Sequence, residues 1–139
     1  MPLFKKQSQP EIEPKDVAFE VAAEMFQKVE KTYLGLLSRE CNMLSFRELT
    51  KIITLAEETL HIMKEYQLGN RGIVTSQTSI YLVSLLQARA KCFFNMGNKD
   101  IDPENNYQLA RIDCNAALEI AAKWDLPASE AHVLLRKLG

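Results

Sequence analysis

Hydrophobic residues recur at steps of three and four over long parts of the chain, which is the period of an amphipathic helix. In the first segment, from Asp16 to about Ser38, the apolar positions are Phe19, Ala22, Ala23, Phe26, Val29, Tyr33 and Leu36. A second helix is predicted from Ser45, because this serine and Glu48 have the spacing of a capping box. Its apolar positions run from Leu49 to Met63, and Gly69 follows as a stop signal.

Three further helices follow the same pattern. The third is expected over roughly residues 75–96, with apolar positions at Ile80, Val83, Leu86, Ala90, Phe93 and Phe94. Asp102 and Pro103 predict the start of a fourth, as an N-cap acceptor followed by proline at the first helical position. It carries Leu109, Ile112, Ala116, Ala117 and Ile120 and ends near Trp124, and a fifth runs from Pro127 to about Leu138. The pattern predicts an all-α chain, either a bundle or an array of helical hairpins.

Composition narrows the classes of partner. The 139 residues fit one domain, and the formal net charge of −1 gives no basic field for a nucleic-acid backbone or an anionic membrane. No apolar stretch is long enough to cross a bilayer, and the N-terminus lacks the apolar core of a signal peptide. The three cysteines, an odd number without metal-type spacing, favour a reducing compartment. A cytoplasmic or nuclear protein is expected.

Two neighbouring segments resemble the two helices of a tetratricopeptide repeat. Residues 88–98, ARAKCFFNMGN, are similar to the first helix, and residues 107–120, YQLARIDCNAALEI, are similar to the second. Ala110, Cys114 and Ala117 have the spacing of the second-helix signature, with cysteine where an aromatic residue is commoner. Small residues at such positions allow two helices to cross closely. The amino-acid sequences of these two segments are most similar to repeats of co-chaperones and immunophilin-type prolyl isomerases.

The resemblance implies a right-handed array of antiparallel helical hairpins with about five to six helices. One tetratricopeptide-like domain is expected over residues 16–139, cut within a third repeat, after a flexible lead-in over residues 1–15. Two features depart from the family pattern. Residues 99–106 read as an insertion at the tip of the central hairpin, and no proline ends the helix after Ala117.

In this family, helix faces line a concave groove that holds a peptide or a helix of a partner. The corresponding positions here are Ser84, Gln87, Lys91, Phe94, Asn95, His132 and Arg136. The same residues could equally form a solvated helix face. Phe94 favours a role in contacts over a merely solvated face, because Phe93 already supplies the apolar face of this helix. A second aromatic residue would contact either a partner or the first hairpin.

Co-chaperone members use a carboxylate clamp of lysine, asparagine and arginine to hold the acidic C-terminus of a heat-shock chaperone. The asparagine position of the central repeat is Ala88 here, which cannot donate a hydrogen bond. The third-repeat lysine and arginine positions fall on Glu130 and Leu134 or, two residues later, on His132 and Arg136. The clamp is absent in the first register and half present in the second.

No constellation in the chain suggests catalysis, and we expect a protein without cofactor or metal. His61 and His132 lack companions at metal-ligand spacing, and Cys92 and Cys114 are expected to fill the hairpin core. Cys41 lies between the first two predicted helices. The expected function is a scaffold or adaptor that binds another protein, with neither nucleic acid nor membrane as partner. The alternatives are a self-associating structural domain and a co-chaperone domain that binds a chaperone tail.

Overall fold

The fold is known from a computed structural model that describes residues 13–36 and 43–139, with side chains described from Phe46 onward in the second range. These residues form five α-helices and a short 3₁₀ turn, η1. The helices are α2 (Pro14–Leu36), α3 (Met43–Glu65), α4 (Val74–Asn98), α5 (Pro103–Trp124) and α6 (Ser129–Leu138), with η1 at Arg71–Ile73. No strand occurs in the described ranges, so the predicted all-α class is confirmed.

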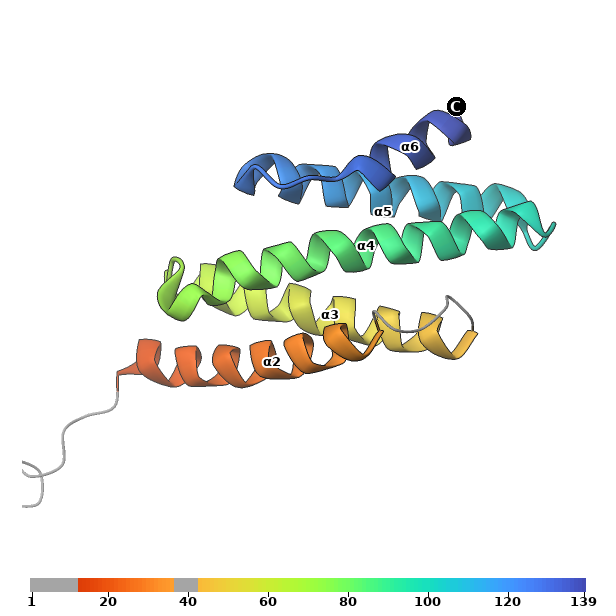
Figure 1. Cartoon of the computed structure of the whole chain (residues 1–139). Coiled ribbons are helices and arrows are strands. Elements are labelled where there is room, and N and C mark those ends of the chain that lie inside the picture. Colours follow the sequence, from red (N-terminus) through yellow and green to blue (C-terminus); the bar gives the residue numbers. More distant parts are fainter. Residues whose placement is uncertain (1–12, 37–42) are drawn as a thin grey trace, which may run out of the picture.

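Consecutive helices run antiparallel and lie side by side in chain order from α2 to α6 (Figure 1). The longest helix, α4, lies in the middle of this order and packs against α2, α3, α5 and α6. Helices far apart in the order, such as α2 and α5, do not pack on one another. The arrangement is therefore an array of helical hairpins, one of the two architectures that the hydrophobic pattern left open.

The predicted helix starts were accurate to about two residues, whereas α3 ends at Glu65, before the expected stop at Gly69. The first helix begins at Pro14 instead of Asp16, so Pro14 and Lys15 belong to the helix, and α6 begins at Ser129 instead of Pro127. Asp102 does precede α5, but its side chain makes no capping hydrogen bond, because its backbone is left-handed with φ 37°. Residues 1–12 of the lead-in predicted over residues 1–15 lie outside the described residues, as do Cys41 and the side chain of Ser45.

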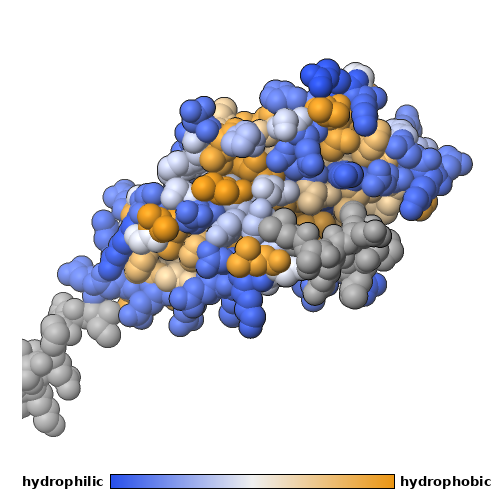
Figure 2. All heavy atoms as spheres, in the orientation of Figure 1, coloured by the Kyte–Doolittle hydropathy of each residue, from blue (hydrophilic) through white to orange (hydrophobic). Residues whose placement is uncertain are grey.

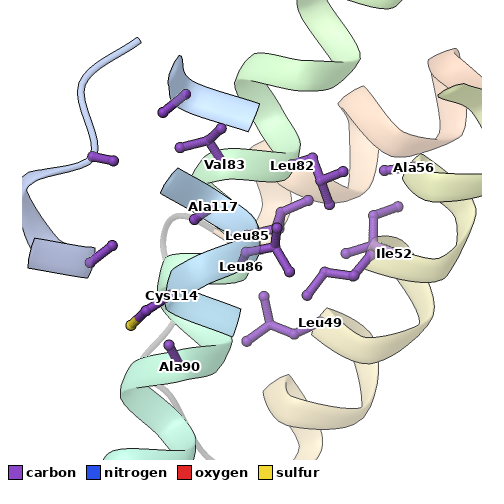
Figure 3. Packing of buried hydrophobic residues seen from close by; sticks show 14 of the residues in the cluster. Leu49, Ile52, Ala56, Leu82, Val83, Leu85, Leu86, Ala90, Cys114 and Ala117 are labelled. Carbon is purple, nitrogen blue, oxygen red and sulfur yellow. The ribbon is translucent and has the colours of Figure 1, made fainter. Parts of the chain in front are cut away.

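Burial is concentrated on the two sides of α4. Figure 3 shows Leu49, Ile52 and Ala56 of α3 facing Leu82, Leu85 and Leu86 of α4. On the other side, Ala90 of α4 meets Cys114 and Ala117 of α5, and all three are fully buried. The prediction that small residues mark this crossing is confirmed. Hydrophilic residues dominate the outer edges of the face seen in Figure 2, while hydrophobic residues gather between the helices.

The crossing of α4 and α5 is also close at their shared end. A β-carbon added to Gly97 would lie 2.5 Å from a ring carbon of Tyr107, closer than carbon atoms approach in proteins. The Tyr107 hydroxyl donates a hydrogen bond to Asn98 Oδ1 at 2.8 Å. The connection is only Lys99–Asp102, since the rest of the expected insertion forms the first turn of α5.

A buried ion pair joins the middle of the same two helices. Arg89 donates from Nε and Nη2 to the two carboxylate oxygens of Asp113 at 2.7 and 2.8 Å. Asp113 retains only 4% of its side-chain exposure and Arg89 18%. Partial burial raises the pKa of Glu57 on α3 above its ordinary value, opposed by the charge of Arg89 and reinforced by that of Asp113. The predicted stripe of α5 omitted Asp113 and included Ile112, which is 52% exposed.

Three helices end in the same hydrogen-bonded motif, with a left-handed residue that is not glycine. After α3, Gln67 has φ 53°, and the Leu68 N–H donates to Met63 O at 2.8 Å. Asp100 and Asp125 occupy the same position after α4 and α5, with φ 62° and 54°. Glycine is the residue that adopts this conformation without a steric cost. Gln67 is the least suited of the three, since aspartate tolerates the left-handed region better.

We predict that Gln67→Gly stabilises the fold by about 1 kcal/mol, because it removes the steric cost of the left-handed backbone. Chemical denaturation measures the difference. The matched control is Gln27→Gly, at an exposed position within α2, which should destabilise by about 1 kcal/mol because glycine is a poor helix former. Equal effects at the two positions would contradict the proposed helix end.

We predict that Asp113→Asn destabilises the fold by about 2 kcal/mol, since it removes the charge that compensates a largely buried arginine. Removing one partner from a fully buried pair costs about 3–5 kcal/mol, and the remaining hydration of Arg89 lowers that figure. Glu119→Gln, an exposed change of the same kind on α5, should alter stability by less than about 0.5 kcal/mol. An Asp113→Asn protein as stable as wild type in urea would show that the pair contributes nothing.

Candidate partner-binding groove

A groove of about 290 Å³ runs between α4 and α6. Three of its lining residues are on α4 and five are on α6: Lys91, Phe94 and Asn95, with Ser129, Glu130, Val133, Leu134 and Lys137. We call this surface the α4–α6 groove. Three residues that the sequence singled out on α4 thus lie together against the helix that follows the central hairpin.

Phe94 is the main apolar surface of the α4–α6 groove. Its ring is half-buried, lies 5.9 Å from the Tyr107 ring of α5, and has Lys137 Nζ of α6 5.9 Å from its centroid. The neighbouring Val133 on α6 is 38% exposed. Of the two roles expected for Phe94, contact with the first hairpin is not seen, since its ring contacts are with α5 and α6. An apolar side chain of a partner could cover Phe94 and Val133 together.

The groove carries both signs of charge. Lys91 of α4 and Lys137 of α6 line it, together with one carboxylate, Glu130. Lys91 and Glu130 are exposed, and the polar side chains of Asn95 and Ser129 lie beside them. Exposed lysines at the edge of an apolar surface steer and orient a partner more than they add affinity. The arrangement fits a segment with one apolar anchor and a nearby acidic group.

The other residues singled out by the sequence lie away from this groove. His132 and Arg136 are exposed on α6 but do not line it, and Ser84 is half-buried further along α4. On α6, the residues that face the groove are Glu130 and Leu134, with Val133 and Lys137 beside them. A chaperone clamp in this groove would need hydrogen-bond donors at residues 130 and 134, but these positions carry a glutamate and a leucine.

Gln87 is buried below α6, where it completes the fold. Its Oε1 accepts a hydrogen bond from the Ala131 N–H at 3.0 Å, and its Nε2 donates to Val83 O at 3.3 Å. The residue before α6 is Ala128, which has no side-chain oxygen to cap the helix. Because the first N–H groups of a helix lack partners within it, Gln87 replaces the missing cap from a neighbouring helix. It thereby holds one wall of the groove in place.

Outside the groove, the side chains that could act as nucleophiles or metal ligands are buried or have partners within the chain. Burial raises the pKa of the Cys114 thiol to about 11, which makes it a poor nucleophile at neutral pH. Cys92 is buried and disulfide-bonded. On the exposed face of α3, His61 Nε2 lies 3.0 Å from Glu65 Oε2. Within the described ranges, no group of three or more His, Cys, Asp or Glu residues could hold a metal ion.

Each described helix is too short or too polar to cross a membrane.

We predict that Gln87→Met destabilises the first turn of α6, because the buried Ala131 N–H loses its acceptor. The cost should be about 1–2 kcal/mol, and hydrogen exchange of the α6 amides should accelerate accordingly. Gln77→Met, a half-buried change on the same helix, serves as control and should leave α6 protected. Unchanged exchange in the Gln87 variant would show that α6 does not depend on this cap.

Comparison with known proteins gives no assignment: no family model matches the chain, and neither a curated protein nor a solved structure matches it. The geometry of the α4–α6 groove is therefore the basis for the function proposed below.

Proposed function

We propose that this chain is a protein-binding scaffold of tetratricopeptide type that holds a segment of another protein in the α4–α6 groove. The observation that supports it most is the position of Lys91, Phe94 and Asn95, which line one groove with the exposed face of α6. The two segments that resemble a repeat form α4 and α5, an antiparallel hairpin with small residues at its crossing.

The groove favours a partner segment over a small molecule. It lies on the surface and has polar side chains along its edges, with exposed Lys91, Asn95 and Glu130 around an apolar centre. An apolar centre with a polar rim is typical of the central contact in protein interfaces. We expect the partner to place one apolar side chain on Phe94 and Val133, with a carboxylate near Lys91 and Lys137.

The proposal differs from a chaperone-tail clamp in the residues that bind. A clamp acts mainly through charge-assisted hydrogen bonds to a terminal carboxylate. Ala88, at the asparagine position of the clamp, provides no donor, and Glu130 in the α4–α6 groove would repel such a carboxylate. An internal segment with an apolar anchor therefore fits better than an acidic chain end.

We predict that Lys91→Glu combined with Phe94→Ala weakens partner binding about tenfold or more, since both the charge and the central anchor are lost. A photo-crosslinking residue at position 95 should capture the partner from a native extract, and the same residue at position 112 should not. Ile112 is 52% exposed on α5, so it samples a surface outside the groove.

Lys91→Glu alone keeps the test valid if the loss of Phe94 disturbs the fold, because Lys91 is exposed. Lys51→Glu, an exposed change on α3, is the matched control and should leave capture intact. Circular dichroism checks the fold of each variant. Capture from positions 95 and 112 alike, or capture that survives the folded groove variants, would contradict the proposal.

A further inference from the structure

A second, larger groove lies on a different surface, where α3 and α5 flank the beginning of α4. Its volume is about 490 Å³. It is lined by three residues of α3, three of the following loop, two of α4 and three of α5: Leu60, Met63, Lys64, Gln67, Gly69, Asn70, Thr75, Ser79, Ile120, Lys123 and Trp124. We call this surface the α3–α5 groove. The function proposed above does not involve the α3–α5 groove.

The surface that the α3–α5 groove offers to a ligand is mainly apolar. Leu60 and Met63 of α3 and Ile120 and Trp124 of α5 supply its hydrophobic lining. The two hydroxyl groups contributed by α4 are already engaged within the chain. Thr75 Oγ1 donates to Gly69 O at 2.6 Å, and Ser79 Oγ donates to Thr75 O at 2.8 Å. What remains for a ligand is mostly hydrophobic contact.

The charge of this groove has a single sign. Lys64 and Lys123 lie on its two sides, and no carboxylate is among its lining residues. Both lysines are exposed, and no ion pair among the described side chains involves either one. Each stands in the last turn of its helix, where the helix dipole also favours a cation. A ligand that complements the groove is therefore apolar with acidic groups beside it.

The chain itself carries a surface of that chemistry on α2. Val17 and Val21 stand one turn apart and are 46% and 45% exposed. Glu20 and Glu24 are exposed on the same helix face, by the period of 3.6 residues per turn, and Glu13 is exposed directly before the first residue of α2. We call these five residues the α2 stripe. Asp16 is not part of it, because its carboxylate is paired with Arg71 at 2.9 Å.

One chain does not bring the two surfaces together, since Val17 and Val21 remain exposed and the α3–α5 groove remains open. We propose that the α3–α5 groove of one chain binds the α2 stripe of a second copy, so that copies associate head to tail. Val17 and Val21 enter the apolar interior, and the glutamates lie beside Lys64 and Lys123. Such a contact uses a different surface on each copy, so it extends to chains or rings longer than a dimer.

Sedimentation velocity over a range of protein concentrations tests this proposal. Wild type should form species larger than a dimer as concentration rises, and added salt should weaken them because exposed charge pairs are screened. Lys64→Glu with Lys123→Glu reverses the charge beside the groove and repels the glutamates of the stripe, and Val17→Ser with Val21→Ser removes the anchors of the stripe. Each double variant alone should associate about tenfold more weakly or not at all.

The decisive arm mixes the two double variants. The groove variant keeps an intact stripe and the stripe variant keeps an intact groove, so the mixture should form a 1:1 heterodimer and nothing larger. Its formation also shows that both variants are folded. Lys51→Glu with Lys99→Glu makes the same charge change outside the groove and should associate like wild type.

Three results would overturn the proposal. They are a wild type that stays monomeric at every concentration, double variants that associate like wild type, and a mixture of folded variants that gives no heterodimer. The first would leave the α3–α5 groove to a different protein. None of these outcomes bears on the α4–α6 groove, because the substituted residues lie outside it.

Discussion

The close crossing of α4 and α5 is the contact on which the rest of the structure depends. Fully buried Ala90, Ala110 and Ala117 let the two backbones approach, and Gly97 leaves room for the Tyr107 ring near the end of the hairpin. A side chain that is one methylene larger at such a position would require the packed core to shift. The ion pair between Arg89 and Asp113 adds a directional bond across the same interface.

The α4–α6 groove is a consequence of this crossing. Since α5 lies close to α4, the helix that follows it returns along α4, and Gln87 caps its first turn from below. The face of α4 that carries Lys91 and Asn95 then meets the exposed face of α6. The groove thus depends on the cap of α6, and the position of α6 depends on the geometry of the hairpin.

Much of the fold could be predicted because local signals coincide with the tertiary structure. The helical period located all five α-helices, and the alternation of small and large residues over 88–120 located the closest crossing. The sequence missed the left-handed residues Gln67, Asp100 and Asp125, because none of them is the glycine that usually marks a helix end. It also missed the burial of Asp113, because a carboxylate is buried only where a partner such as Arg89 is supplied by another helix.

By itself, the sequence determined the helices and their amphipathic faces, because these follow from the local period of side chains. Lys91, Phe94 and Asn95 were assigned to a groove by the resemblance to a repeat. The sequence did not determine which faces meet. Gln87, His132 and Arg136 were placed in one groove by analogy, yet Gln87 is buried and the other two do not line the α4–α6 groove. Only the tertiary structure decided this, since the register and rotation of α6 depend on its packing against two earlier helices and on one buried hydrogen bond. The α3–α5 groove arises in the same way, from three helices that are separated along the chain.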